Sequence, residues 1–182
     1  MEFRFSHIHI VGASGSGTTT LARALAGELV ARHLDTDAYF WLPTTPPFTT
    51  KRPVDERLEM LGADLDAQPR WVLSGSLLSW GLPLAPRFDL VVFLFVAPEV
   101  RMARTLAREV ERYGDDILPG GPMHSQHLEF LDWSRTYDHP AATGRSLATH
   151  RAWLATLTCP VLEIAGTQPV EETVSRVLAF NP

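Results

Sequence analysis

The chain has 182 residues, of which 45% are hydrophobic and 20% charged, and these values are typical of one globular domain with a proper core. The formal net charge of -5 argues against a general nucleic-acid binder. Cys159 is the only cysteine, which excludes an internal disulfide and fits a reducing compartment. No apolar run approaches the roughly 20 residues that a membrane span needs, and the first five residues lack a signal-peptide pattern. We therefore expect a cytoplasmic protein with no nucleic-acid or membrane partner.

Apolar patterning predicts strands that alternate with helices along the chain. The expected strands cover residues 3–11, 33–35, 71–76, 89–96 and 160–165. The expected helices cover residues 18–31, 54–67, 98–113, 146–157 and 170–179, and residues 125–137 are helical or irregular. The continuous apolar run Leu90–Val96 is typical of a central parallel strand that is covered on both faces. The alternation predicts a three-layer α/β fold with a parallel sheet.

A glycine-rich turn lies between the first expected strand and the first expected helix. Gly12 and Gly17 are spaced as G-x-x-x-x-G-x-T, which fits the Walker A pattern, and Thr19 stands where a hydroxyl would bind Mg²⁺. Glycines let the backbone N–H groups of such a turn point inward, and the helix N-terminus adds its positive dipole end. The residues expected to bind phosphate are Gly12, Ser14, Gly15, Ser16, Gly17, Thr18, Thr19 and Thr20.

Thr18 stands where the Walker A pattern requires lysine. Phosphate binding by backbone amides does not depend on that lysine, whereas catalysis is less secure without it, because the lysine normally reaches the β- and γ-phosphates. Two other interpretations of the turn remain open. One is a glycine-rich turn with no ligand. The other is a dinucleotide-binding turn, although its G-x-G-x-x-G pattern would need glycine at Ser14 or at Thr20.

Asp35 and Asp37 follow the second expected strand. On an extended segment they would point in different directions. One could hold Mg²⁺ or accept a proton from a substrate hydroxyl while the other binds substrate, so both are candidate bases. We expect Asp35 to bind substrate as well, and Asp37 to hold Mg²⁺ together with Thr19. The structural alternative is a turn or a helix cap, since aspartate favours both.

The proline-rich segment 41–50 cannot be a helix and is expected to form an exposed loop. Trp41 is a candidate wall of a substrate pocket, with packing as the alternative. Lys51, the only lysine among 16 basic residues, and Arg52 follow the loop. These two side chains could supply the positive charge that Thr18 lacks, although ordinary surface charge explains them equally well.

Ligands gather at the carboxyl ends of the strands in doubly wound folds. We therefore expect the glycine-rich turn, the aspartate pair, residues 74–76 and residues 166–168 to share one edge of the sheet. Ser74 and Ser76, at the end of the third expected strand, are candidate substrate-binding residues.

Four arginines form a stripe on the expected helix 98–113. They fall within an arc of about 80°, with Ala103, Leu106 and Val110 on the opposite side. No acidic residue interrupts the stripe, and the guanidinium fork suits phosphate, so an anion-facing surface is expected. A solvated face paired with Glu109 or Glu111 is the alternative. The stripe consists of Arg101, Arg104, Arg108 and Arg112.

Together these motifs resemble the adenylate-kinase-like branch of P-loop kinases, which includes nucleoside monophosphate, shikimate and gluconate kinases. The resemblance covers most of the chain and rests on the glycine-rich turn, on Asp35-Thr36-Asp37 and on the arginine helix. It implies a P-loop NTPase fold with strand order 2-3-1-4-5. It also implies that Gly166-Thr167-Gln168 binds adenine, that a segment at about 112–130 is lid-like, and that an insertion at about 39–68 binds substrate.

The leading hypothesis is a single kinase-like domain over residues 1–182 that transfers the γ-phosphoryl group of ATP, with Mg²⁺, to a small-molecule or nucleotide acceptor. It would act as a monomer or homodimer. A protein that binds nucleotide or phosphate without catalysis is the second hypothesis, and Thr18 motivates it. An NAD(P)-binding oxidoreductase is the third. The residues expected to carry the transfer are Asp35, Asp37, Arg104, Arg108 and Arg112.

Overall fold

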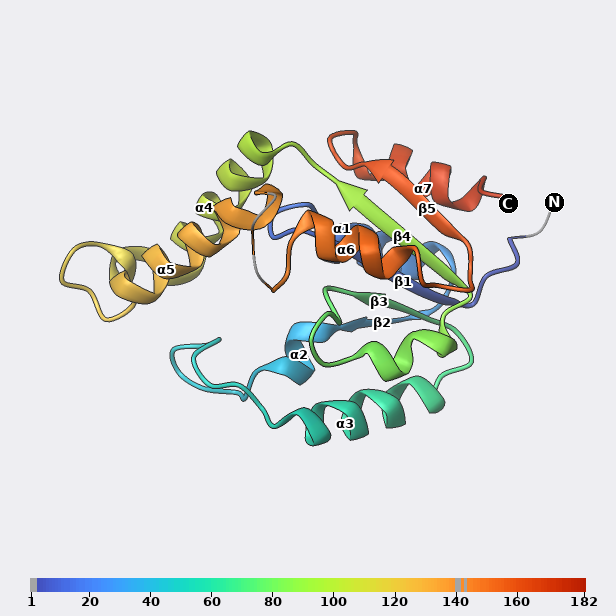
Figure 1. Cartoon of the computed structure of the whole chain (residues 1–182), viewed down its shortest axis with the longest axis horizontal. Coiled ribbons are helices and arrows are strands. Elements are labelled where there is room, and N and C mark those ends of the chain that lie inside the picture. Colours follow the sequence, from blue (N-terminus) through green and yellow to red (C-terminus); the bar gives the residue numbers. More distant parts are fainter. Residues whose placement is uncertain (1–2, 140–141, 143) are drawn as a thin grey trace.

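The computed structural model describes residues 3–139, 142 and 144–182. Five parallel strands form one sheet in the order β2-β3-β1-β4-β5 (Figure 1). The expected fold class and strand order are therefore confirmed. The strands are β1 (His7–Gly12), β2 (Arg32–Asp35), β3 (Trp71–Ser74), β4 (Leu90–Phe95) and β5 (Val161–Ala165).

Helices connect the strands and cover the sheet. Short 3₁₀ helices are η1 (Leu82–Arg87), η2 (Gly114–Ile117) and η3 (Thr136–Asp138). In the described part of the chain, no helix has the length and apolar character needed to cross a membrane. The α-helices are α1 (Thr18–Glu28), α2 (Thr36–Phe40), α3 (Val54–Asp66), α4 (Pro98–Tyr113), α5 (His124–Arg135), α6 (Leu147–Leu154) and α7 (Val170–Leu178).

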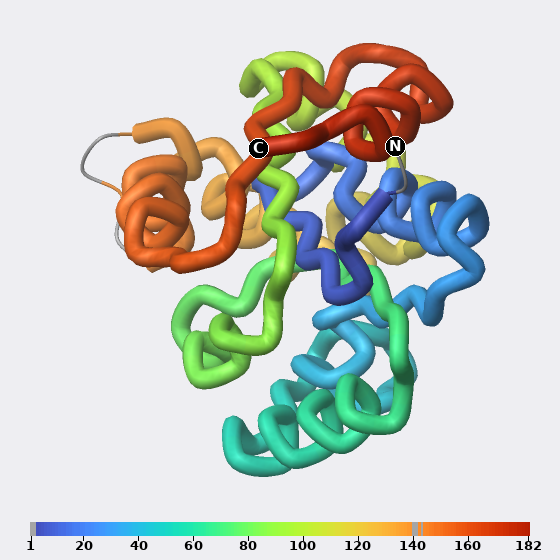
Figure 2. The backbone as a smooth tube through the Cα atoms, turned by 90° about the vertical axis from the view of Figure 1, so that its right-hand side faces the viewer, coloured from blue at the N-terminus to red at the C-terminus, as the bar shows by residue number. Residues whose placement is uncertain are grey.

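The alternation of side chains along each strand supplies a core on both faces of the sheet. In β1, Ile8 and Ile10 pack with residues of α1 and α7, whereas Val11 packs with residues of α3 and α6 on the other face. Figure 2 shows α1 and α6 on opposite sides of the strands. A fully buried isoleucine or leucine in such a core contributes roughly 1.5–3 kcal/mol. The result is the three-layer arrangement that the sequence predicts.

All strands point in one direction, so their carboxyl ends meet at one edge of the sheet. The arrowhead of β4 in Figure 1 points toward α4, and α5 packs beside α4 on the same side of the molecule. The turn after β1, the start of α2 and the turn after β5 also lie at this edge, because each follows the end of its strand. The fold thus brings together the segments that carry the candidate functional residues.

Candidate functional site

The turn between β1 and α1, residues 12–19 (the glycine loop), is tightly wound. Gly15 and Gly17 have φ angles of 78° and 93°, which residues with a Cβ rarely adopt. The N–H and the hydroxyl of Ser16 both donate to the carbonyl oxygen of Ala13, at 3.2 and 2.8 Å. Because α1 begins at Thr18, at the end of the loop, its first N–H groups have no helical partners and can bind an anion.

Thr19, in the first turn of α1, contacts the end of β2. Its hydroxyl donates to Oδ2 of Asp35 at 3.0 Å. The other oxygen of Asp35, Oδ1, accepts from the N–H of Asp37 at 3.1 Å and caps α2. The segment expected to be extended is therefore helical from Thr36, because the Asp35 cap starts a helix there. The carboxylate that touches Thr19 is Asp35 rather than Asp37.

The pairing of Thr19 with Asp35 fits Mg²⁺. This ion takes oxygen ligands and keeps several waters, so it binds through one or two carboxylates plus substrate phosphates rather than in an all-protein cage. The described residues contain no group of three or more His, Cys, Asp or Glu side chains placed to hold a metal. Thr19 and Asp35 are the side chains that would hold Mg²⁺ at the end of the glycine loop.

The Asp37 side chain is accessible to solvent yet surrounded by charged groups. Loss of hydration among these neighbours and repulsion from Asp35 raise the pKa of the Asp37 carboxyl above its usual value. The positive charges of Arg145, Arg108 and Arg112 act in the opposite direction. A carboxylate with increased proton affinity beside three guanidinium groups is suited to accept a proton next to an anionic substrate.

Helix α4 presents its arginine side to the glycine loop. A Cβ built on Gly15 would lie 2.7 Å from the Thr105 hydroxyl and against the carbonyl oxygen of Arg101. On the other side of the helix, Leu106 and Val110 are 46% and 52% exposed. The side opposite the arginines therefore faces solvent, and the polar side packs on the loop.

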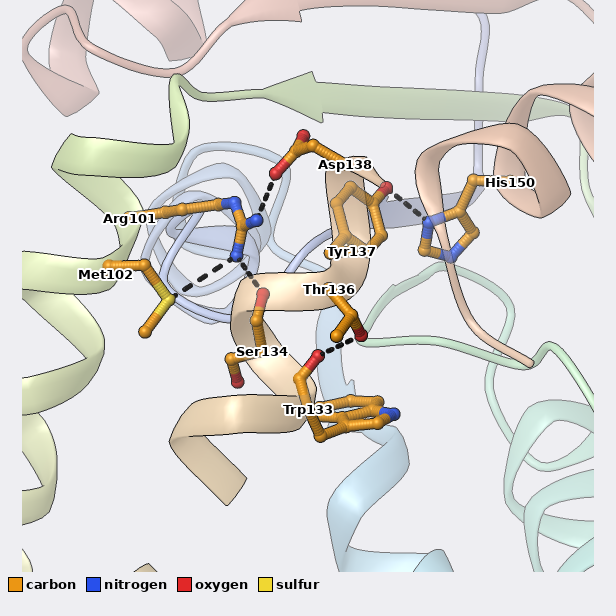
Figure 3. Close-up of polar contacts among 8 residues, drawn as sticks. All are labelled: Arg101, Met102, Trp133, Ser134, Thr136, Tyr137, Asp138 and His150. Atoms are coloured by element: carbon orange, nitrogen blue, oxygen red, sulfur yellow. Dashed lines mark hydrogen bonds and ion pairs between the residues drawn. The ribbon is translucent and has the colours of Figure 1, made fainter. Parts of the chain in front are cut away.

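Arg101 does not belong to an anion-facing stripe. It is fully buried, forms an ion pair with Asp138 and donates to the carbonyl oxygen of Ser134 at 2.7 Å (Figure 3). The guanidinium carbon of Arg101 also lies over the ring of Tyr137, 5.1 Å from the ring centroid. These contacts pair a buried charge whose Nε has no hydrogen-bond partner among the described residues, and they fasten α4 to η3.

The three other arginines of the stripe are exposed, with different surroundings. Arg104 donates to the carbonyl oxygen of Gly166 at 3.0 Å. Arg112 lies over the ring of Phe48, 4.2 Å from its centroid, and 3.8 Å from a carboxylate oxygen of Glu109. Arg108 acts on Asp37 through its charge. The stripe thus extends from the turn after β5, past the carboxylate pair, to the proline-rich loop.

An open cleft borders the glycine loop on the side of β4 and β5. Its empty volume, including the part open to solvent, is about 610 Å³. Gly166 packs so closely that a Cβ there would lie 3.1 Å from the carbonyl oxygen of Ser16. Thr167 is exposed, and the side-chain oxygen of Gln168 accepts a hydrogen bond from Arg176 at 3.1 Å. The cleft is lined by Ser16, Gly17, Thr20, Leu21, Leu94, Arg104, Gly166, Gln168, Val170 and Thr173.

Hydrogen bonds within the fold engage the two candidate serines after β3. Ser74 is fully buried, and its Oγ lies 3.0 Å from Nε2 of His33 and 3.4 Å from the carbonyl oxygen of Leu34. Oγ of Ser76 lies 3.1 Å from Nε2 of His150 in α6. Ser74 therefore ties β3 to β2, and Ser76 ties the turn after β3 to α6.

The proline-rich loop closes on itself and touches α4 and α5. Trp41 pairs with Lys51 as an isolated antiparallel bridge, and the rings of Trp41 and Phe48 are 6.1 Å apart. The guanidinium of Arg52 donates to the carbonyl oxygen of Tyr39 at 3.0 Å. Among the described contacts, none joins Lys51 or Arg52 to the glycine loop. The side chain of Gln126, on α5, donates to the carbonyl oxygen of Phe48 at 2.9 Å.

Arg145 was not singled out by the sequence. Its Nη2 donates to Oγ of Ser14, in the glycine loop, at 2.9 Å across 131 positions. No motif marks this arginine: the only local signal is the capping box of Ser146 and Thr149 at the start of α6. Its place at the site comes entirely from the tertiary fold.

The strand order argues against a dinucleotide-binding site. In the dinucleotide-binding order 3-2-1-4-5-6, the second strand neighbours the first, whereas β3 and β4 flank β1 in this sheet. Residues 8–118 match the family described as the AAA domain. The chain belongs to this P-loop family. The AAA-domain match covers the glycine loop, the aspartate pair and α4.

Further comparisons show a relative of similar length and solved structures with the same fold. The protein YqaC of Bacillus subtilis (strain 168), described as uncharacterized, is 45% identical over 174 residues, which is 96% of each chain. A shikimate kinase from Acinetobacter baumannii in complex with shikimate shares the fold with a TM-score of 0.57 and 18% identity, over 97% of this chain and 92% of that one.

A gluconokinase from Sinorhizobium meliloti 1021 has a TM-score of 0.54 and 20% identity, over 98% of this chain and 92% of the gluconokinase. At these identities the likeness concerns the fold alone. The AAA-domain chain thus has the fold of adenylate-kinase-like P-loop kinases, as the resemblance implied.

Proposed function

We propose that this AAA-domain protein is a phosphotransferase that uses ATP and Mg²⁺ to phosphorylate a hydroxyl of a small-molecule acceptor. The observation that carries the proposal is the hydrogen bond between Thr19 and Asp35 at the end of the glycine loop. It joins the hydroxyl of a Walker-type loop to a carboxylate, as a site for a phosphate-bound metal ion requires.

The nucleotide fits the cleft beside the glycine loop. The adenosine part would lie near Leu94 and the turn after β5, and the phosphates would extend along the N-terminus of α1. Backbone N–H groups from Gly15 to Thr19 would hold the β-phosphate. Arg104, at the boundary of the cleft through its bond to Gly166, would contact the phosphate chain.

Asp37 is the proposed base. When bound, ATP and Mg²⁺ supply the phosphoryl group and neutralise charge on it. Asp37 would accept the proton of the acceptor hydroxyl while the hydroxyl oxygen forms a bond to phosphorus and the bond to the ADP oxygen breaks. Arg108 and Arg112, whose charges already act on Asp37, would offset the negative charge of the transferring group.

Thr18 supports a second candidate function, a nucleotide-binding protein without catalysis. A loop that lacks the Walker lysine keeps its backbone N–H groups and its helix dipole, which suffice for binding. Such a protein would respond to the nucleotide by a change of shape or partner. The carboxylate pair with its facing arginines favours the kinase, because binding alone does not need a base.

The experiment that tests the proposal is a titration of the protein with ATP, with and without Mg²⁺, followed by thermal shift and by release of ADP. A kinase is expected to bind ATP with Mg²⁺, to release ADP slowly by itself and faster with an acceptor from a panel of hydroxyl compounds. Asp37→Asn should bind ATP and lose the acceptor-stimulated release. Binding without Mg²⁺ dependence and without ADP would support the non-catalytic candidate. No binding at all would reject both.

A further inference from the structure

The glycine loop carries no basic side chain of its own. Thr18 occupies the lysine position, and the only lysine of the chain, Lys51, lies near the ring of Phe40, 5.9 Å from its centroid. The nucleotide phosphates would therefore meet backbone dipoles at the loop without a neutralising cation. A cation has to come from another part of the fold if the loop is to hold a triphosphate as other Walker loops do.

Arg145 is the basic side chain that reaches the loop. Its Nη2 donates to Oγ of Ser14 at 2.9 Å, and within the described residues this is the hydrogen bond that joins a basic side chain to residues 12–19. Ser14 follows directly after Ala13 at the start of the loop, whereas Thr18 stands at its end. The guanidinium therefore contacts the first part of the loop, whereas a Walker lysine would stand near its end.

The position of Arg145 is fixed by its neighbours. The guanidinium carbon lies 4.6 Å from the centroid of the Trp133 ring. Before Arg145 in the sequence, the Tyr137 hydroxyl lies 2.6 Å from Nδ1 of His150 (Figure 3). Directly after Arg145, the Ser146 side chain caps α6 by accepting a hydrogen bond from the N–H of Thr149 at 3.2 Å. The Tyr137–His150 bond joins η3 to α6, and the cap fixes the start of α6 directly after Arg145, so these contacts position the arginine beside the loop.

Arg145 is also incompletely satisfied in the free protein. Its Nε is buried and has no hydrogen-bond partner among the described residues. Burial and the charges of Arg108 and Arg101 lower its pKa, and Asp37 and Tyr137 offset this only in part. A fixed guanidinium with an unused donor and like-charged neighbours is stabilised by an arriving anion.

We propose that Arg145 supplies, from a segment distant in the sequence, the positive charge that Thr18 cannot give to the nucleotide phosphates. The ligand is a nucleoside polyphosphate, and the inference rests on the proposed nucleotide-dependent function. Arg145 would contact the phosphates directly and would exchange its bond to Ser14 for bonds to phosphate oxygens. Thr18 is then compatible with a functional phosphate site, because the cation comes from Arg145 instead of position 18.

The test compares Arg145→Gln, Arg145→Lys and the double variant Thr18→Lys/Arg145→Gln by calorimetric titration with Mg²⁺-ATP and with adenosine. The control is Arg151→Gln, an exposed arginine of α6 that is paired with Glu163 at 3.3 Å. We expect Arg145→Gln to weaken ATP binding at least tenfold and to leave adenosine binding unchanged. Arg145→Lys should stay within about threefold of the unaltered protein, the double variant should recover most of the lost affinity, and the control should bind normally.

The ratio of the two affinities separates a phosphate contact from a structural role. Equal losses for ATP and adenosine, or unchanged ATP affinity in Arg145→Gln, would overturn the inference while the proposed function stands. A folded double variant that does not recover ATP affinity would overturn it as well. If Arg145→Gln is unfolded, Arg145→Met decides in the same way, because it removes the charge and keeps an aliphatic side chain beside Trp133. If the unaltered protein binds neither ATP nor ADP, the proposed function itself fails.

Discussion

The backbone of Gly15 packs directly against the carbonyl oxygen of Arg101, the residue through which α4 is fastened to η3. The same arginine is fully buried and paired with Asp138. The glycine loop, α4 and η3 are therefore one packed unit, although more than 120 positions separate Gly15 from Asp138. A substitution that disturbs the contact of Gly15 with Arg101 is therefore expected to affect the phosphate end of the site.

Gly15→Ala is expected to disrupt this unit. The φ angle of 78° disfavours any Cβ, and the added methyl group would overlap the carbonyl oxygen of Arg101. We expect a loss of about 2–4 kcal/mol in the free energy of unfolding, from backbone strain and overpacking, together with loss of ATP binding. Urea unfolding and ATP titration measure the two effects.

Gly27→Ala is the matched control. Gly27 lies within α1, has nothing within 4 Å of a built Cβ and is exposed. Alanine in an exposed helix interior stabilises by roughly 0.5–1 kcal/mol relative to glycine, so this variant should gain stability and bind ATP normally. Equal behaviour of the two variants would show that α4 does not constrain the loop.

Thr19→Val removes the hydroxyl that bonds to Asp35 and keeps the shape of the side chain. We expect ATP affinity to lose its dependence on Mg²⁺, with a decrease of tenfold or more when Mg²⁺ is present, because an oxygen ligand disappears. Thr19→Ser retains the hydroxyl and should keep the dependence. Titrations at several Mg²⁺ concentrations measure it, and the same dependence in Thr19→Val would remove Thr19 from the metal site.

The fold was accessible from the sequence because its signals are local. The apolar runs of β1 and β4 predict strands, and the glycine spacing 12–17 predicts the turn before α1. The course of the chain after β2 was predicted wrongly. An aspartate that ends a strand can equally cap a helix, and the bond of Asp35 to the N–H of Asp37 is visible only in three dimensions.

The site was accessible only in part, for a physical reason. The glycine loop is recognisable because its backbone conformation demands particular residues at fixed spacing. The roles of Arg101 and Arg145 are not recognisable in the sequence, because tertiary packing alone creates them. Arg101 lies on a helix stripe and forms a buried ion pair with Asp138. Arg145 lies in a loop and contacts the glycine loop. Sequence periodicity places Arg101 beside Arg104 and Arg108, yet burial separates their roles.

Arg108→Ala is expected to lower the rate of phosphoryl transfer roughly 100-fold or more while ATP still binds. The side chain is exposed and its charge acts on Asp37, so its removal takes a cation from the developing transition state. Arg135→Ala is the control: this arginine on α5 is exposed and paired with Asp132, and such pairs contribute little. Turnover measured with the acceptor found in the panel distinguishes them, and equal rates would exclude Arg108 from the transfer.

Two buried histidines make the stability of the protein sensitive to acid. Burial lowers the pKa of His9 to about 4 and that of His150 to about 3, from 6.5. His9 is stacked on Phe88 and His150 is bonded to Tyr137 and Ser76. Both are neutral in the folded chain at neutral pH, as these surroundings require.

The sign of the effect follows from proton uptake. Below pH 6.5 the unfolded chain binds protons at these histidines and the folded chain does not. The free energy of unfolding therefore decreases as the pH is lowered. The slope is about 1.4 kcal/mol per pH unit for each histidine, so that from pH 7 to pH 5 the two together lower the free energy of unfolding by on the order of 2–4 kcal/mol.

Urea unfolding between pH 5 and 7.5 measures the slope. His150→Gln should be less stable at pH 7 and should show a shallower dependence, and His7→Gln at the start of β1 controls for loss of a partly exposed histidine. An unchanged slope in His150→Gln would mean that His150 is not the group that takes up the proton.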